Sequence, residues 1–299
     1  MRVSLIEKLV SMEDAASRVG DGARLALGGL SVYQHPMAFV HELVRQRRQN
    51  LVVVGVLNGP ELDILVGAGC VARVETSYVG LERFGVARNF RRAVESGEVA
   101  VEFYSELLAF DRFRASEDGL SFAVSKALAG TDVARNERLK PFFCPITGVE
   151  YLAAPSAEPD VAVIHAVMAD PYGNVLCPTS KQLPQSFDAI VARSTDTVIV
   201  TAERIVENAY VRRHPHLTVI PGFRVAAVVE DPFGAHPCNS LQAYTLDTLH
   251  FQEYVLSSRD SVSFDGYLNR YVRGTACHLD YLQQVGLERL LSLRTGEMI

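Results

Sequence analysis

The sequence predicts an α/β protein with an open, mostly parallel sheet and helices on both faces of that sheet. Six runs, most of them rich in β-branched residues, are almost continuously apolar instead of alternating with polar residues, which is typical of strands buried on both faces. Segments in which apolar residues recur at helical spacing separate these runs. Strands that alternate with helices along a chain favour a parallel sheet with helices on each side.

The predicted elements follow in order along the chain. A first helix is expected after Ser11, because a serine followed by Glu13 and Asp14 is typical of a helix start. The run Arg24–Leu27 predicts the first strand, and the apolar spacing from Pro36 to Arg47 predicts a second helix. The other strands are expected at Leu51–Val56, Val99–Phe103, Val161–Ile164, Thr197–Val200 and Val225–Val229.

Two further stretches complete the organisation of what we expect to be a single domain, residues 1–299. The stretch Thr131–Glu158 contains several prolines and glycines, and we expect an insertion or a lid there. Apolar residues between Tyr281 and Leu293 predict a terminal helix that docks on the body of the protein or on another protomer.

Composition and charge disfavour several classes of protein. The chain is 48% hydrophobic and 21% charged, as soluble globular proteins are, and no stretch approaches the roughly 20 apolar residues that span a bilayer. A net charge of −6 gives no basic surface for nucleic acid, and Arg45, Arg47 and Arg48 are expected to form a solvated helix end. Charges throughout Met1–Val10 leave no signal-peptide core, so we expect a cytoplasmic protein.

The cysteines and histidines predict no metal site. The five cysteines are widely spaced, without a Cys-x-x-Cys pair, and the eight histidines show no ligand spacing. Buried free thiols are therefore expected.

The segment from Gly28 to Pro36, which we call the glycine bend, is the most informative part of the chain. It follows the first predicted strand and precedes the second predicted helix, and Pro36 suits the first helical turn. Two adjacent glycines let backbone amides approach a ligand without intervening side chains. The bend is thus either a cradle for an anion or a polarised carbonyl, or a plain tight turn.

The wider run from Asp21 to Pro36 resembles the signature of the A subunits of class I CoA-transferases: acid and glycine, an apolar triplet, two glycines, an aromatic residue and a proline. Two positions depart from that signature. Leu30 stands where the family usually has phenylalanine, and Gln34 where it often has glycine or, in the glutaconate branch, arginine. Similarity to the glutaconate branch extends over nearly the whole chain, through Leu65–Gly69, Phe90–Arg92, Glu95–Glu98, Glu102–Ser105, Pro159–Ala166, Ile220–Gly222, Gly234–Pro237 and Tyr281–Leu293.

The resemblance implies a CoA-transferase fold of the NagB/RpiA-like type, with a CoA thioester as substrate and no permanently bound cofactor. In this family a glutamate attacks the acyl thioester, forms an acyl anhydride and then carries CoA as a glutamyl thioester. Two-chain members hold that glutamate on a B subunit, in a Ser-Glu-Asn-Gly type of run. The nearest run here, Ser116–Gly119, is not expected to supply the nucleophile. We therefore expect half of an active site, completed by a B subunit in a heterodimer or α2β2 heterotetramer.

In this half-site the residues of the glycine bend are the first candidates for substrate binding. The resemblance implies that backbone amides around Gly28, Gly29 and Leu30 stabilise negative charge on an acyl oxygen. Ser31 and Gln34 follow on the same loop and are expected to line the acyl pocket.

A second group of candidates lies near the end of the predicted strand at 99–103. Strand alternation, if it continues, places Glu102 and Glu106 on one face and Ser105 on the other. Either glutamate is a candidate general acid or base, and the alternative is a salt bridge at the sheet rim. Lys126 is either a partner for a substrate carboxylate or CoA phosphate, or a surface lysine. His165 is expected to be a satisfied core histidine.

The leading functional hypothesis is the A subunit of a heteromeric CoA-transferase that acts on carboxylic or dicarboxylic acyl-CoA. The alternative is an enzyme of the same fold that hydrolyses or decarboxylates its substrate, for which Glu102 and Glu106 are the candidate acids or bases. A ligand-sensing regulator is disfavoured because the first strand begins near Arg24, which leaves no room for a helix-turn-helix. A non-catalytic scaffold role stays open.

Overall fold

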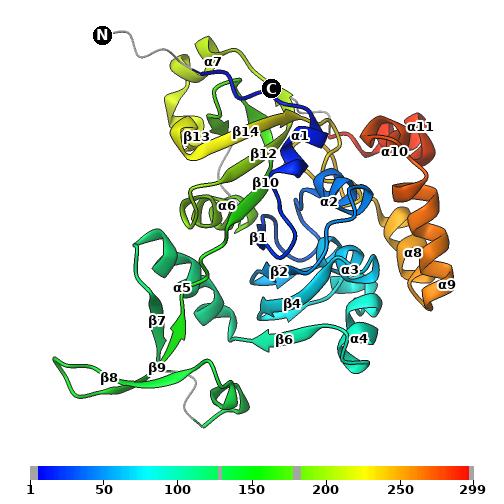
Figure 1. Ribbon diagram of the computed structural model, residues 1–299. Helices are drawn as coiled ribbons and strands as arrows, with labels where there is room; N and C mark the ends of the chain where they lie inside the picture. Colours follow the sequence, from blue (N-terminus) through cyan, green and yellow to red (C-terminus); the bar gives the residue numbers. More distant parts are fainter. Residues whose placement is uncertain (1–5, 127–129, 178–182, 296–299) are drawn as a thin grey trace.

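A computed structural model describes residues 6–126, 130–177 and 183–295, and its centre is a parallel sheet. In space the strands follow the order β14-β12-β10-β1-β2-β4-β6, and each neighbouring pair is parallel (Figure 1). These strands are β1 (Arg24–Leu27), β2 (Leu51–Val54), β4 (Val71–Thr76), β6 (Ala100–Phe103), β10 (Val161–Ala169), β12 (Val198–Ile205) and β14 (Val225–Glu230).

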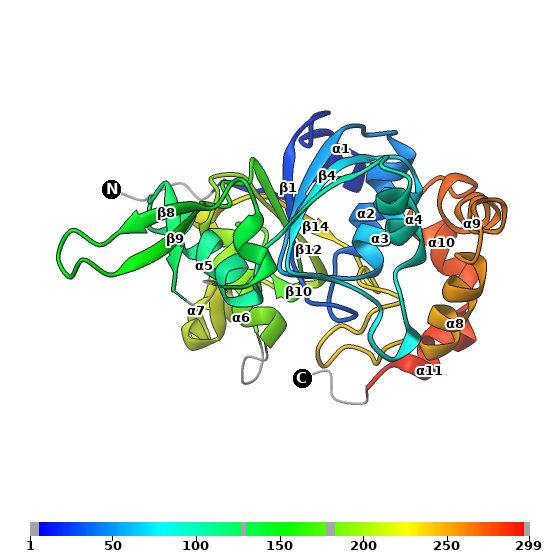
Figure 2. The same ribbon diagram turned by 90° about the horizontal axis from the view of Figure 1, so that it is seen from below.

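Shorter strands lie around this sheet. β11 (Val175–Leu176) and β13 (Thr218–Ile220) extend it in antiparallel pairing beyond the end of β10, and β3 (Leu57–Asn58) pairs with β5 (Tyr78–Val79). A separate antiparallel sheet, which we call the arm, has the order β7-β9-β8 and projects from the body (Figures 1 and 2). Its strands are β7 (Phe122–Ser125), β8 (Lys140–Phe143) and β9 (Glu150–Pro155).

Helices cover both faces of the parallel sheet, as Figure 2 shows. On one face lie α1 (Met12–Ser17), α2 (Met37–Arg45), α3 (Pro60–Gly67) and α4 (Arg88–Glu95). On the other lie α5 (Glu106–Glu117) and α6 (Leu183–Arg193), and α7 (Asn208–Arg213) follows β12. An outer layer covers the first face: α8 (Thr248–Ser257), α9 (Ser261–Leu268), α10 (His278–Val285) and α11 (Leu287–Leu293). Short helical turns are η1 (Glu82–Phe84), η2 (Asp132–Arg135), η3 (Pro215–Leu217), η4 (Gly222–Arg224) and the π-helical η5 (Asn269–Arg273).

The predicted fold class is confirmed, and burial explains why the strand pattern was readable. Leu25 and Leu27 of β1 pack into the large core beneath α1–α4, whereas Ala26 packs into the core beneath α5 and α6. Because both faces are covered, the strand is apolar along its buried length. The first helix begins as expected, since the Ser11 hydroxyl accepts the N–H of Asp14 at 3.0 Å.

Three details differ from the sequence expectations. Residues 281–293 form two helices instead of one, because Gly286 has φ of 99° and ends α10. β6 ends at Phe103 and α5 begins at Glu106, so strand alternation does not extend across Glu102, Ser105 and Glu106. Residues 131–158 hold η2, β8 and β9, and they belong to the arm together with β7, which begins earlier in the chain. Among the described helices, none has the length and apolar character needed to cross a membrane.

Candidate active site

The glycine bend lies at the point where the strand order reverses. From β1 the chain moves outward through β2, β4 and β6, then returns to place β10 on the other side of β1. In open parallel sheets a crevice forms at the carboxyl ends of the strands at such a switch point, and ligands bind there. The bend begins directly at the carboxyl end of β1, at this switch point.

The backbone amides of the bend bond within the protein. Gly28 N–H donates to the carbonyl of Val163 at 2.7 Å, and Leu30 N–H donates to the carbonyl of Tyr33 at 2.9 Å. Gly29 N–H donates to Asp188 Oδ1 at 2.8 Å. In this arrangement Gly28, Gly29 and Leu30 therefore do not offer the free oxyanion donors that the resemblance implied, because each donor already has an acceptor.

Asp188 explains the glycine at position 28, and the backbone of the bend explains the glycine at position 29. A Cβ on Gly28 would lie 2.4 Å from Asp188 Oδ1, so any side chain would displace the carboxyl group. Gly29 has φ of 82°, and a Cβ there would lie 2.6 Å from the carbonyl oxygen of Tyr33. The bend thus wraps around the buried carboxyl group of Asp188, which comes from α6.

A cavity of about 290 Å³, which we call the bend cavity, opens beside residues 30–34. Three residues expected to bind substrate line it: Leu30, Ser31 and Gln34. Gly28 and Gly29 lie behind that wall and are not among the lining residues. The other lining residues, which the sequence reasoning missed, are Tyr33, Leu57, Glu82, Pro184, Gln185, Asn239 and Leu241.

Strained backbone gathers at this cavity. Ser31, Gln34 and Glu82 all have left-handed φ angles, of 58°, 59° and 49°, and all three line the cavity. Non-glycine residues in this region store strain, and such residues cluster at ligand sites. The Ser31 hydroxyl donates to Glu82 Oε1 at 2.6 Å, so a hydrogen bond joins two of these three strained residues.

Gln34 forms a fixed polar floor. Its Nε2 donates to the carbonyl of His165 at 3.1 Å and to Asp188 Oδ2 at 3.3 Å, and its Oε1 accepts from Gln185 Nε2. Behind it a small void of about 20 Å³, lined in part by His165 and Asp188, has room for a single water molecule. Five of the ten residues that line the bend cavity are polar or charged, but most of the surface that they and the others expose to it is apolar, which suits an acyl chain or an alkyl amide.

Asp188 is a buried acid without a cationic partner among the described residues. Burial raises the pKa of Asp188 to about 7, although the hydrogen bonds from Gly29 and Gln34 favour the ionised form. A carboxyl group that titrates near neutral pH beside a cavity is typical of functional sites.

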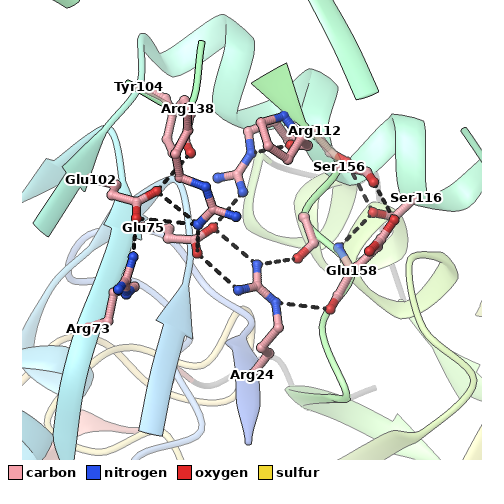
Figure 3. A network of polar contacts seen from close by, with 12 residues as sticks. Arg24, Arg73, Glu75, Glu102, Tyr104, Arg112, Ser116, Arg138, Ser156 and Glu158 are labelled. Atoms are coloured by element: carbon pink, nitrogen blue, oxygen red, sulfur yellow. Dashed lines mark hydrogen bonds and ion pairs between the residues drawn. The ribbon is translucent and has the colours of Figure 1, made fainter. Parts of the chain in front are cut away.

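Glu102 belongs to a different cluster, drawn in Figure 3. Arg138 Nη1 lies 3.0 Å from Glu102 Oε2, Arg73 forms a second ion pair with Glu102, and the Tyr104 hydroxyl donates to it at 3.1 Å. These contacts support the alternative that the sequence left open, a salt bridge at the sheet rim, because the carboxylate is already held by two guanidinium groups.

The centre of that cluster is Glu75, whose side chain is fully buried. Its oxygens pair with Arg112 at 2.5 Å, with Arg24 at 2.9 Å and with Arg138 at 3.0 Å (Figure 3). Burial alone would raise the pKa of Glu75, but the arginines outweigh it and lower the pKa to about 2. Arg112 lies on α5 and Arg138 follows η2, so the cluster fastens α5 and the chain next to the arm to the sheet.

The remaining candidates lie apart from the bend cavity. Ser105 is the N-cap of α5, its hydroxyl accepting the N–H of Leu108 at 3.3 Å, and Glu106 is exposed in the first turn of that helix. Lys126 is exposed after β7. None of these three lines the bend cavity, so the catalytic role of Glu106 and the substrate-binding roles of Ser105 and Lys126 stay predictions.

Several histidines are structural. His165 is buried, with Nδ1 bonded to the Thr201 hydroxyl at 2.8 Å and Nε2 to Glu203 at 2.7 Å, as expected for a satisfied core histidine. The fold also gathers His236, Asp247 and His250 within 4.8 Å, a group that spacing did not reveal. Asp247 already bonds to His236 at 2.9 Å and forms an ion pair with Arg289 at 2.6 Å, so protein groups hold both of its oxygens.

The fold and the site together define an α/β protein with a small-molecule cavity at the carboxyl edge of its sheet. The chain belongs to the coenzyme A transferase family, whose model matches residues 9–231. It is 33% identical to the A subunit of 3-oxoadipate CoA-transferase from Pseudomonas knackmussii, over 90% of this chain and 94% of that one. It is 30% identical to the A subunit of glutaconate CoA-transferase from Acidaminococcus fermentans, over 97% and 95%.

Other relatives have different lengths or printed activities. An uncharacterized protein of Archaeoglobus fulgidus is 36% identical over 99% of this chain, which spans 66% of that relative's length. Among solved structures, glutaconate coenzyme A-transferase from Acidaminococcus fermentans superposes with a TM-score of 0.91 over 96% of both chains, at 29% identity. The decarboxylase AibA/AibB superposes with a TM-score of 0.77 over 89% of this chain and all of that one, at 29% identity. The IpdA subunit of a cholesterol ring-cleaving hydrolase from Rhodococcus jostii is 26% identical, over 91% of this chain and 94% of that one.

We predict that Glu75→Gln destabilises the fold by about 3–5 kcal/mol at neutral pH, because the buried Arg112 loses its charged partner. The folded pKa of about 2 lies below the ordinary value of 4.5, so the wild-type contribution is present above about pH 4.5 and lost as the pH falls toward 2. Urea unfolding should therefore show that the difference in the free energy of unfolding between wild type and Glu75→Gln becomes smaller as the pH is lowered. Glu95→Gln, which removes an exposed partner of Arg91, should cause no measurable loss. An equal loss in both variants would contradict the role of burial.

We predict that Asp188→Asn removes part of the pH dependence of stability. The folded pKa of about 7 lies above the ordinary 3.8, so between these values the folded state keeps a proton that the unfolded state has released. Wild-type stability then falls as the pH rises through this window, by on the order of 4 kcal/mol. Asparagine cannot ionise and still accepts the Gly29 N–H. The free energy of unfolding of Asp188→Asn minus that of wild type should rise as the pH rises through this window. The same difference for Asp196→Asn, at an exposed position, should not change with pH.

Proposed function

We propose that this chain is the A subunit of a heteromeric class I CoA-transferase, which moves CoA between carboxylic or dicarboxylic acids through a glutamate on a B subunit. Family membership and the relatives named as A subunits support a partner-dependent transferase. The observation that carries the proposal is the bend cavity. It is built by the segment that bears the family signature, and it lies at the switch point of the sheet.

The proposed reaction exchanges one carboxylate for another on CoA. The partner's glutamate attacks the thioester carbonyl, the carbon–sulfur bond breaks, and an acyl glutamyl anhydride and CoA thiolate form. The thiolate then attacks the glutamyl carbonyl, which releases the first acid and leaves a glutamyl-CoA thioester. The incoming acid reverses these two steps, so no water is consumed and no net oxidation occurs.

This chain contributes shape and a water-poor wall to that reaction. Leu30, Leu57 and Leu241 offer apolar surface for the acyl chain or the pantetheine arm. Tyr33, which is 45% exposed, stands at the rim, where a partner chain can cover it. Excluding water matters because the anhydride intermediate would otherwise hydrolyse.

A hydrolase or decarboxylase is the second candidate, and one observation favours it. Glu82 is the only carboxylate that lines the bend cavity among the described residues, and it is exposed there. A carboxylate at the cavity rim is placed to activate a water molecule for attack on a thioester. In this candidate Glu82 takes the role for which the sequence offered Glu102 and Glu106.

Reconstitution with a B-type CoA-transferase subunit from the same organism tests both candidates in one assay. The complex is incubated with an acyl-CoA and acetate, and products are identified by mass spectrometry. A transferase yields acetyl-CoA and the free acid without release of free thiol. Release of free CoA, with no acetyl-CoA, would overturn the transfer proposal in favour of the hydrolase, and formation of a CoA ester shorter by one CO₂ would favour the decarboxylase.

Glu82→Gln separates the two mechanisms further. If the partner's glutamate is the nucleophile, transfer by the Glu82→Gln complex should stay within about tenfold of wild type. If Glu82 activates water, hydrolysis should fall by about 10²–10⁴-fold. Glu98→Gln, at an exposed glutamate outside the bend cavity, is the matched control and should change neither rate.

A further inference from the structure

A second and larger cavity lies at the opposite edge of the sheet from the glycine bend. Its volume is about 610 Å³, within the range of small-molecule sites, and we call it the arginine cavity. It forms where α2 and α3 end and where β2 and β4 begin. The strands are parallel, so the amino ends of β2 and β4 lie on the edge away from the bend.

Among the described residues, four arginines line this cavity and no carboxylate does. The arginines are Arg45, Arg47, Arg48 and Arg273. Arg45 pairs with Glu42 at 2.8 Å and Arg273 with Asp265 at 2.5 Å, outside the cavity wall. Arg47 and Arg48 have no ion pair with any described residue, although Arg48 Nη2 donates to the neutral Gln46 Oε1 at 2.8 Å. The cavity therefore carries an excess of about two positive charges within a protein whose net charge is −6.

Two guanidinium nitrogens of the cavity arginines are buried and have no acceptor in the described part of the chain. They are Arg45 Nη2 and Arg48 Nε. A buried charged donor without an acceptor is destabilising, so native proteins rarely leave one unless something else completes the bond. The sequence analysis expected a solvated helix end here. Arg47 is indeed exposed, whereas Arg45 and Arg48 are half-buried, and all three line the cavity.

The arginines are not needed to cap the helices that end at the cavity. The carbonyls of Glu42, Leu43 and Val44 in α2 already accept the backbone N–H groups of residues 46, 48 and 47. At the end of α3, the carbonyls of residues 64, 65 and 66 accept those of residues 68, 70 and 69. Helix ends therefore do not account for the positive charge.

The described floor of the cavity supplies no negative charge either. Cys70 lies there, and burial raises the pKa of its thiol to about 11, so the sulfur stays neutral. Asp21 is nearby, with Oδ1 accepting the N–H of Gln49 at 2.9 Å, but it does not line the cavity. Arg47 and Asn50 hold left-handed φ angles of 55° and 58°, which fix the turn that aims this segment.

We propose that the arginine cavity binds a small molecule that carries phosphate groups. Planar guanidinium forks match phosphate oxygens with paired, charge-assisted hydrogen bonds, and Arg47 and Arg48, which have no carboxylate partner among the described residues, are the groups that supply them. A concave hollow of this size selects a small anion over an extended polymer. The site is separate from the bend cavity and does not depend on the proposed reaction.

Calorimetric titration of the purified full chain at low salt tests the proposal with inorganic phosphate, pyrophosphate, ADP and adenosine. One site should bind the phosphate-bearing probes and not adenosine, and added salt should weaken binding. The double variant R47A/R48A should bind at least about tenfold more weakly, since a hydrogen bond to a charged group is worth roughly one decade or more. R212A/R213A removes the same charge from exposed positions on α7 and should bind as wild type.

The outcomes are distinct. Tighter binding of ADP than of phosphate identifies the ligand as a nucleotide, and equal affinity identifies free phosphate; both support the site. Absence of heat and of any thermal upshift with all three phosphate probes overturns it, as does equal weakening in both double variants or equal binding of adenosine. Circular dichroism confirms that the R47A/R48A fold is intact, and if it is not, the single variant R47A carries the same test, because Arg47 is exposed.

Discussion

The contact on which the site depends is the one between the buried carboxyl group of Asp188 and the backbone of Gly29. One side chain from α6 explains the missing Cβ of Gly28, accepts the N–H of Gly29 and reaches the amide of Gln34. The residues that follow form the wall of the bend cavity. Since a buried carboxyl group without a cation is unfavourable, it persists only where the surrounding structure holds it firmly.

The structure treats its two central buried acids in opposite ways. Glu75 sits among three arginines, and its pKa falls to about 2, so it is a permanent charge that fastens α5 and the chain next to the arm to the sheet. Asp188 has no cation among the described residues, and burial raises its pKa to about 7. Glu102 resembles Glu75 in this respect, because Arg73 and Arg138 form ion pairs with its carboxylate. A carboxylate held in that way is a poor choice for moving protons, whereas Glu82 at the cavity rim has no such clamp in the described chain.

The sequence predicted the parts of the fold that depend on local pattern. β1 was expected at Arg24–Leu27 and is found there, because continuous apolar runs report burial on both faces. The bend and the family were predictable from the run at Asp21–Pro36 for the same local reason. The role of Asp188 was not predictable, because it lies 159 residues from its partner Gly29 and the residues around it in the sequence do not indicate this contact. The solvated helix end expected at Arg45–Arg48 holds for the exposed Arg47, but the cavity that these arginines line was not predictable, since the sequence pattern is the same with or without a cavity.

Helix α2 relates the two edges of the sheet. It begins directly after the glycine bend and ends at the first arginine of the other cavity, and its residues from Met37 to Val44 are buried. A nine-residue helix is about 13 Å long, and packing on all sides prevents it from shifting at one end alone. The proposed anion would therefore contact the far end of α2, the rigid helix whose near end follows the bend with Ser31 and Gln34. Communication between the cavities would require α2 to have a second packed position, because a single fixed helix transmits nothing.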